Sequence, residues 1–465
     1  MTRIYKKQYI LSSRKLDFPQ MVCLELQYGY LYIDNDLTFL QASDKKGRSY
    51  IVIGNAFCTD KYPKQILDDI KVYERDSIIE LTNNWTGRWL LIQDSYLITD
   101  ATGLMSAFYW KDNSNWLVSS SLSLLSNILK VSIDQKVSDK GLDWHLLPDT
   151  IVPGVKSLFC TQQINFFKEI EIIPIIRFAD KRQLTSDMKV KDVNDRLVVA
   201  LKNIEKYSGR NILIALTAGK DSRLVLSAAL SAKVEFSTYT MEHPNMILAD
   251  KNLPGKIASK YGFKWDFIKM GKKNALLADD YLHFNGGNSK GADIIFYTSG
   301  QYQQLSGDAI VIRSGIFEAG QQYGRRTMGN TLESLRCGFF KYYKTSLKLG
   351  GQKESFERWE YNAKQYPIEF IDIRDRFYIE QRVNGWVSAI EQALTINDFD
   401  TLQIANCQAI ISTLLSVTEE ERYNNHLAYR MIQSLVPDLL NYPVNKQTIV
   451  DKFNVMIRGV FNKFF

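Results

Sequence analysis

Residues 216–223, Leu-Thr-Ala-Gly-Lys-Asp-Ser-Arg, have the types and spacing best suited to chemistry in this sequence. They lie between a predicted apolar strand and a predicted helix, so backbone N–H groups and the positive end of the helix dipole favour a phosphate group there. Gly219 permits a tight turn, and the hydroxyl groups of Thr217 and Ser222 can donate hydrogen bonds. Asp221 repels phosphate, but it can hold Mg²⁺, whose remaining positions take phosphate oxygens. The loop therefore predicts a nucleotide site with magnesium.

Two alternatives stay open at this loop. Lys220 and Arg223 are cations beside it, and each either contacts phosphate or is solvated. The whole segment could also be an ordinary strand-to-helix turn in which Asp221 or Ser222 caps the helix and nothing binds.

The elements that position the loop follow from the hydrophobic periodicity after residue 185. Alternating segments predict strands at 211–216, 234–240, 264–270 and 309–313, with helices at 222–232 and 248–261. Such alternation is typical of a parallel sheet with helices on both faces. From residue 371 onward helices dominate, and Thr418 followed by Glu421 forms a capping box that marks one helix start.

The first part of the chain predicts a separate, sheet-rich domain. Short runs rich in Tyr, Ile, Val and Trp are separated by Asp, Asn and Gly at 23–33, 49–53, 88–92, 96–99 and 116–119. Residues 145–176 contain three prolines and Gly154 between apolar pieces, so we expect an extended connector there.

The composition is that of a globular protein. The 465 residues are 45% hydrophobic and 23% charged, which excludes a disordered or low-complexity chain. The net charge of +7 is spread along the chain, so an anionic ligand is expected and nucleic acid is not. The five cysteines form no C-x-x-C pair, no stretch of about 18 apolar residues is present, and we expect a cytoplasmic protein with no membrane span.

Four segments together resemble the asparagine synthetase family. Residues 217–222 resemble its S-G-G-x-D-S pyrophosphate loop, and residues 236–241 resemble its next strand, which lines the adenine. Asp250, Ala258 and Gly262 match the D-x7-A-x3-G spacing of the helix that follows. Residues 313–318 resemble the S-G-E-G-x-D-E loop that faces the same pyrophosphate.

This resemblance implies an α/β adenine-nucleotide α-hydrolase-like (PP-loop) synthetase domain at 181–465, with a helical C-terminal part. It implies ATP and Mg²⁺ as cofactors and two metal ligands, Asp221 and Glu318. The nucleotide-binding residues that it implies are Leu216, Thr217, Ala218, Gly219, Lys220, Ser222, Thr240, Ser314 and Gly315. Alternatively, Glu318 is only an ion-pair partner of Arg325 or Arg326.

Residues 1–180 resemble the glutamine amidotransferase domain of the same family, an α+β domain with the N-terminal-nucleophile (Ntn) hydrolase fold. The resemblance rests on Gly87 and on residues 100–103, 108–110 and 116–120. Glutamine-dependent members use Cys at position 2 as the nucleophile, whereas this chain has Thr2. We therefore predict a domain kept for structure, without glutaminase activity, as in the branch that includes β-lactam synthetase and lasso-peptide cyclases.

The reaction implied by this resemblance is amide formation from a small-molecule carboxylate and an amine. The carboxylate attacks the α-phosphate of ATP, pyrophosphate leaves, and the amine displaces AMP from the acyl-adenylate. In the family a lysine late in the chain assists the second step, and Lys446 is the candidate, with a surface lysine as the alternative. Tyr378 and Arg382 lie four residues apart and either line an acceptor pocket or pack as ordinary side chains.

Two competing functions remain open. One is a catalytically inactive asparagine-synthetase-like scaffold or binding protein, and the other is an adenylating enzyme that modifies RNA. Residues 450–465 form an amphipathic pattern that suits either an anionic membrane surface or packing against the protein. A homo-oligomer is compatible with the sequence.

Overall fold

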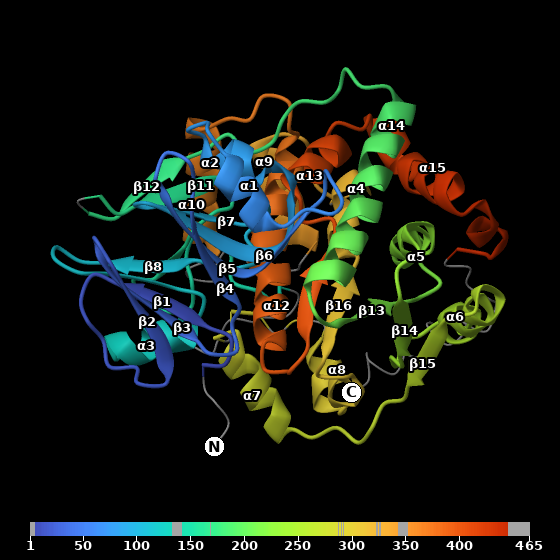
Figure 1. Cartoon of the computed structure of the whole chain (residues 1–465), viewed down its shortest axis with the longest axis horizontal. Coiled ribbons are helices and arrows are strands. Elements are labelled where there is room, and N and C mark those ends of the chain that lie inside the picture. The colour runs from blue at the N-terminus through green and yellow to red at the C-terminus, as the bar shows by residue number, and fades with distance from the viewer. Residues whose placement is uncertain are drawn as a thin grey trace.

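The computed structural model describes residues 5–132, 142–167, 169–286, 288–289, 291, 293–321, 324, 327–342 and 352–444. These residues form two antiparallel sheets, built by the first 180 residues, and one parallel sheet built by the remainder. Figure 1 shows the antiparallel sheets on one side of the molecule and the parallel sheet on the other, with the long helix α4 (Ser186–Tyr207) between them. The mixed α/β architecture predicted from the sequence is confirmed.

The first antiparallel sheet has the strand order β10-β8-β9-β1-β3-β2. Its strands in chain order are β1 (Tyr9–Ser12), β2 (Met21–Leu26), β3 (Gly29–Asp34), β8 (Phe108–Lys111), β9 (Trp116–Ser119) and β10 (Lys156–Ser157). The second sheet has the order β12-β11-β7-β6-β5-β4. Its strands are β4 (Phe39–Ser43), β5 (Ser49–Cys58), β6 (Trp85–Gln93), β7 (Tyr96–Thr99), β11 (Gln162–Asn165) and β12 (Glu171–Pro174).

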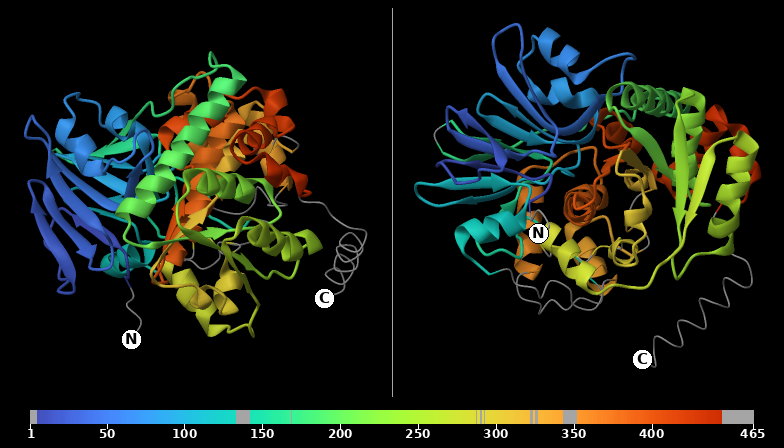
Figure 2. Two further views of the ribbon diagram at one scale, coloured as in Figure 1. Left: turned by 45° about the vertical axis from the view of Figure 1, so that its right-hand side comes forward. Right: turned by 60° about the horizontal axis from the view of Figure 1, so that its bottom comes forward.

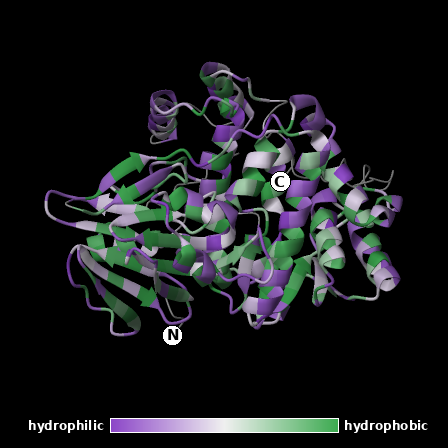
Figure 3. Ribbon diagram, turned by 45° about the horizontal axis from the view of Figure 1, so that its top comes forward, coloured by the Kyte–Doolittle hydropathy of each residue, from purple (hydrophilic) through white to green (hydrophobic). Residues whose placement is uncertain are grey.

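The two antiparallel sheets pack face to face, because alternate residues of each strand point to opposite sides. In β1, Leu11 belongs to the core between the sheets, whereas Ile10 packs outward beneath α3 (Leu122–Leu129). Helices α1 (Ile66–Val72) and α2 (Ile78–Leu81) cover the outer face of the second sheet. Figure 3 shows hydrophobic residues along these strands and hydrophilic residues in the loops that join them. The first part of the chain therefore has four layers: helix, sheet, sheet, helices.

The prediction of an extended connector at 145–176 is wrong. This segment contributes β10, β11 and β12, which extend both antiparallel sheets at their edges. The prolines lie outside the paired residues of β10 and β11, and Pro174 ends β12 at the edge of its sheet, where a missing N–H donor is tolerated.

The parallel sheet has the order β15-β14-β13-β16-β17. Its strands are β13 (Asn211–Ala215), β14 (Phe236–Met241), β15 (Lys264–Ile268), β16 (Ala309–Arg313) and β17 (Asp400–Gln403). Ile212 and Ile214 face α4, α5 (Lys220–Ala232), α13 (Gln408–Leu415) and α15 (His426–Leu435). Leu213 faces the opposite side, where α7 (Leu276–Phe284), α8 (Ile294–Thr298) and α12 (Ser388–Leu394) pack. The predicted parallel sheet with helices on both faces is confirmed.

The predicted bounds of two elements are correct: α6 occupies Leu248–Tyr261 and β16 occupies Ala309–Arg313. Three others are shifted by two residues: β14 begins at 236 instead of 234, β15 ends at 268 instead of 270, and α5 begins at 220 instead of 222. The Thr418–Glu421 capping box starts α14 (Glu419–Tyr423).

The remaining described helices lie in the C-terminal half. They are α9 (Leu332–Tyr342), α10 (Gln352–Gln365) and α11 (Ile373–Phe377), followed without a break by a π-helix at Tyr378–Val387. Among the described residues, no helix combines enough length with enough apolar character to cross a bilayer.

Buried hydrogen bonds join the antiparallel sheets to the rest of the molecule. Figure 2 shows the two parts side by side. Among the side-chain hydrogen bonds that cross between them are those of Thr86 to the Ile404 carbonyl at 2.7 Å, Arg88 to Gln392 at 2.6 Å, Thr102 to Asn406 at 2.8 Å, the Cys160 N–H to Asn384 at 2.8 Å, and Thr161 to Glu380 at 2.6 Å. Buried donors and acceptors that pair across a boundary fix the relative orientation of its two sides.

Candidate nucleotide site

Segments that follow three neighbouring strands meet at one edge of the parallel sheet. Residues 216–219 follow β13, Thr240 is the next-to-last residue of β14, and residues 314–318 follow β16. The chain runs from β13 to β14 and β15, and then returns to add β16 and β17 on the other side of β13. In open parallel sheets, ligands bind beyond the carboxyl ends of the strands, where the strand order reverses. That point lies between β13 and β16, where the two predicted loops are neighbours.

The loop after β13 is held by its own side chains. Ser222 Oγ accepts a hydrogen bond from the Thr217 N–H at 3.1 Å, and Thr217 Oγ1 accepts one from the Gly219 N–H at 3.0 Å. Gly219 is the N-cap of α5 with φ −72°, a conformation that any residue adopts. The turn therefore does not use glycine's conformational freedom, and the loop and helix lie where expected.

Neighbouring elements support the same loop. The Leu216 N–H donates to the Tyr239 carbonyl at 2.9 Å, and Thr240 Oγ1 donates to the Leu216 carbonyl at 2.7 Å. Asp250 of α6 accepts a hydrogen bond from the Ala218 N–H at 2.7 Å. Leu216, Ala218 and Thr240 thus fix the shape of the loop. The N–H groups of the first turn of α5 have no partner within the helix and remain the donors best placed for an anion.

Arg223 is a structural residue of this loop. Its guanidinium is fully buried and donates to the Ala218 carbonyl at 2.9 Å. It also donates to three carbonyls of the C-terminal segment, those of Leu439, Tyr442 and Pro443, at 3.2, 2.7 and 2.6 Å. A guanidinium committed to four carbonyls is not available to phosphate, so the phosphate alternative for Arg223 is wrong.

Asp221 and Lys220 open α5 and share a neighbour from the second loop. Gln321 donates to both oxygens of Asp221 at 3.2 and 3.3 Å and accepts from Lys220 Nζ at 3.0 Å. Lys220 Nζ lies 3.6 Å from Asp221 Oδ2. Burial raises the pKa of Asp221 above its usual range, and the Lys220 charge opposes that rise. The cluster therefore holds a carboxylate whose charge is only partly compensated.

Glu318 completes this cluster from the 3₁₀ helix at Gly315–Gln321. Burial raises its pKa, Arg382 lowers it, and the negative charge of Asp221 raises it further. Two carboxylates near enough for the charge of one to raise the pKa of the other suit a divalent cation, because the cation neutralises both. Asp221 and Glu318 lie near each other in this sense.

The π-helix at Tyr378–Val387 packs against the Glu318 segment. Tyr378 Oη donates to the Gly315 carbonyl at 3.2 Å. One turn later, Arg382 stacks on the Trp386 ring, with its guanidinium carbon 3.5 Å from the ring centre, and lies 5.2 Å from the ring centre of Trp144. Tyr378 and Arg382 therefore make packing contacts beside the cluster, and their role in an acceptor pocket stays a prediction.

Ser314 and Gly315 lie directly after β16. Ser314 is half-buried, Gly315 is exposed, and the Gly315 N–H donates to Gln403 of β17 at 2.8 Å. Sequence reasoning missed Gln321 and Gln403, since an amide carries no spacing signal. Lys446, Thr2, Arg325, Arg326 and residues 450–465 lie outside the described residues, so their predicted roles stay predictions.

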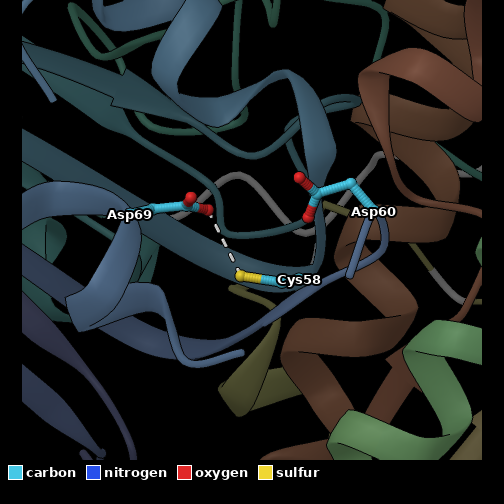
Figure 4. A group of neighbouring side chains, drawn as sticks. All are labelled: Cys58, Asp60 and Asp69. Atoms are coloured by element: carbon cyan, nitrogen blue, oxygen red, sulfur yellow. Dashed lines mark hydrogen bonds between the residues drawn. The ribbon is translucent and has the colours of Figure 1, made fainter. Parts of the chain in front are cut away.

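A different group of side chains has metal-ligand geometry but is already neutralised. Cys58, Asp60 and Asp69 offer ligand atoms within 4.8 Å of one another, and Figure 4 shows Cys58 and Asp69 pointing toward each other. Lys64 Nζ lies 2.8 Å from Asp60 and 2.5 Å from Asp69. Its ammonium group provides the positive charge that a metal would bring.

Comparisons with known proteins give only distant matches. No protein-family model matches the chain, and no curated protein matches it. Among solved structures, NMN synthetase from Francisella tularensis is 14% identical and covers 43% of this chain and 94% of its own, with a TM-score of 0.23. NH3-dependent NAD synthetase from Campylobacter jejuni is 12% identical and covers 42% and 92%, with a TM-score of 0.20. The glutamine phosphoribosylpyrophosphate amidotransferase from B. subtilis is 8% identical and covers 72% and 74%, with a TM-score of 0.23. At these TM-scores the matches decide neither fold nor function.

Proposed function

We propose that this chain is an ATP-dependent, AMP-forming amide-bond synthetase of the asparagine synthetase type, without glutaminase activity of its own. The observation that supports this most is the pair of carboxylates, Asp221 and Glu318, which follow adjacent parallel strands at the switch point and lie near enough for the charge of Asp221 to raise the pKa of Glu318. Two oxygen ligands of this kind suit Mg²⁺, which would neutralise charge on the phosphates of ATP.

The remaining groups of the site divide the binding work. The first-turn N–H groups of α5 and the Lys220 ammonium would hold the pyrophosphate portion of ATP, with Ser314 and Gly315 beside them. A substrate carboxylate attacks the α-phosphate, the α–β phosphoanhydride bond breaks and pyrophosphate leaves. An amine then attacks the acyl carbon, and AMP leaves with the electron pair of the acyl–oxygen bond. Lys446 remains the candidate that assists this second step.

We further propose that residues 1–180 are an Ntn-like, amidotransferase-derived domain and that residues 181–465 are the synthetase domain. The helix–sheet–sheet–helix layers of the first part support the first half of that proposal. The chain entering β1 is joined to the second part, because Lys7 Nζ lies 2.7 Å from Asp400 of β17. This contact supports a structural role for the first domain.

An inactive scaffold is the second candidate, and one observation favours it. The N–H groups of Thr217, Ala218 and Gly219 already donate to side chains of the protein, so fewer loop donors remain for phosphate. A scaffold would not respond to nucleotide.

Calorimetric titration of ATP into the purified protein, with and without Mg²⁺, tests the proposal. We expect magnesium-dependent binding that Asp221→Ala abolishes and that Asp195→Ala, at an exposed carboxylate on α4, leaves unchanged. Release of AMP and pyrophosphate in the presence of a panel of carboxylates and amines would then identify the substrates. ATP binding by Asp221→Ala equal to that of the wild type would refute the assigned site, and no binding by the folded wild type would favour the scaffold.

A further inference from the structure

The 3₁₀ helix that carries Glu318 begins at a residue that other elements hold in place. That residue is Gly315, whose N–H donates to Gln403 Oε1 at 2.8 Å and whose carbonyl accepts from Tyr378 Oη at 3.2 Å. The first N–H groups of a helix have no partner inside it, so an acceptor from another element helps to fix where the helix starts. The place of Glu318, three residues further along, therefore depends on Gln403.

Gln403 accepts from Gly315 because its amide is held in one orientation. An amide has an oxygen at one end and an NH₂ group at the other, and a half-turn exchanges them. Gln403 Nε2 donates to Glu391 Oε1 at 2.8 Å, and an ionised carboxylate only accepts. The two residues are 2% and 1% exposed, so water does not compete for these bonds. The Glu391 carboxylate thus turns the amide oxygen of Gln403 toward Gly315.

The Glu391 carboxylate is itself held by charge and by a hydroxyl group. It lies on α12, which packs on the parallel sheet (Figure 1). Arg313 Nη1 lies 3.5 Å from Glu391 Oε1, and Arg313 Nη2 lies 2.7 Å from Asp293. Thr401 donates to the second oxygen of Glu391. A buried carboxylate needs such partners, because burial without them is costly.

This buried group adjoins the candidate nucleotide site. Arg313 and Gln403 are paired residues at the carboxyl ends of β16 and β17, and the loop with Glu318 follows Arg313 directly. Residues that support metal ligands in this way typically change metal affinity by about 10- to 100-fold when they are replaced.

We propose that Glu391 is a positioning residue of the nucleotide site: it orients Gln403, which fixes Gly315 and through it the place of Glu318 relative to Asp221. The inference rests on the proposed function, since it gives the pair a role in magnesium-dependent ATP binding. Glu391 and Gln403 act through the loop and do not contact ATP or Mg²⁺. The Gly315 N–H then positions the helix and is not a phosphate donor.

Calorimetric titration of ATP with Mg²⁺, at a temperature where each variant is folded, tests the pair. We expect Gln403→Met to bind about tenfold more weakly or worse, and Glu391→Met to lose affinity as well. The double variant should bind no more weakly than Gln403→Met, because both changes act through Gly315. Gln183→Met, at an exposed glutamine, is the control and should bind as the wild type does.

An exchange of the two side chains supplies the rescue. In the double variant Glu391→Gln, Gln403→Glu, the amide at 391 can donate to the carboxylate at 403, and that carboxylate can still accept from the Gly315 N–H. We expect this variant to keep most of the wild-type affinity for ATP with Mg²⁺. A loss as large as that of Gln403→Met would overturn the proposal, and if Gln403→Met does not fold, Glu391→Met and the exchanged pair decide.

Three other results would also overturn it. One is wild-type affinity in Gln403→Met and Glu391→Met together with a lower unfolding temperature, since the pair would then only stabilise the fold. Another is additive losses in the double variant of methionines. The third is tighter ATP binding by Gln403→Met, which would mean that the released Gly315 N–H binds phosphate.

Amide hydrogen exchange of residues 314–321, measured without ATP, separates this proposal from the proposed function. We expect faster exchange in Gln403→Met and Glu391→Met than in the wild type, the Gln183→Met control and the exchanged pair. If the folded wild type binds no ATP, the proposed function fails, and this exchange pattern alone decides whether the pair fixes the helix. If the wild type binds ATP and neither exchange nor affinity responds, the positioning role fails while the proposed function stands.

Discussion

Replacing Arg223 should separate the loop after β13 from the C-terminal segment that it ties down. The guanidinium is fully buried and donates to four carbonyl oxygens, one in the loop and three at 439–443. Arg223→Met keeps much of the side-chain volume but leaves these oxygens without a donor. Two of the four contacts are fully buried, and an unsatisfied buried polar group costs about 1 to 3 kcal/mol.

We expect Arg223→Met to lower the free energy of unfolding by about 2 to 6 kcal/mol, because two fully buried carbonyls each lose their donor at about 1 to 3 kcal/mol. Arg223→Lys should recover only part of this loss in stability, because a single ammonium group cannot reach carbonyls on both segments. Urea unfolding measures the difference, with the exposed Arg182→Met as the control.

A second measurement links this contact to the site. If Arg223 holds the Ala218 carbonyl in place for nucleotide binding, Arg223→Lys should also weaken magnesium-dependent ATP binding at a temperature where it stays folded. A loss of stability below about 1 kcal/mol for Arg223→Met would refute the reasoning, since it would mean that the carbonyls find water or other donors.

Two further predictions concern buried carboxylates. Because the pKa values of Asp221 and Glu318 are raised, Mg²⁺ binding should weaken as pH falls through a range above that of ordinary carboxylates. ATP titrations across pH measure this, and an ATP affinity that does not change with pH would contradict it. Without Mg²⁺, the same raised pKa values lower the stability of the folded state as pH rises through that range. Glu380 is fully buried and accepts from Thr161, Trp359 and Arg376, so Glu380→Ala should cost about 3 to 5 kcal/mol in urea unfolding, and a change under 1 kcal/mol would show that the pairing is replaceable.

The sequence predicted what depends on local pattern. The apolar run before residue 216 and the alternation of strands and helices that follows specify a parallel sheet, and the capping box at Thr418 specifies a helix start. Asp221 and Glu318 were paired through the resemblance of their two loops to one family, and their shared role as metal ligands stays a prediction. Strands β11 and β12 could not be predicted in this way. Their pairing depends on residues far away in the chain, whereas the prolines within the segment suggested a connector.

The contacts that shape the site were beyond sequence reasoning for the same reason. Arg223 lies beside the loop in the chain, and only the packing of a segment more than 200 residues later shows that its guanidinium is bonded to that segment. Gln321 and Gln403 hold the site through single hydrogen bonds, which leave no pattern in sequence.

The hydrogen bonds between the antiparallel sheets and the rest of the molecule have a consequence for how such a chain can change over evolution. Cutting away the first 180 residues would remove the partners of Asn384, Gln392 and Asn406 and would expose to water the apolar core that Ala101 and Leu104 share with the parallel-sheet part. A domain can lose its catalytic activity and still be retained once it covers apolar surface of the neighbouring domain. Deleting the domain then lowers the stability of the protein at once, whereas substitutions at a former active site do not.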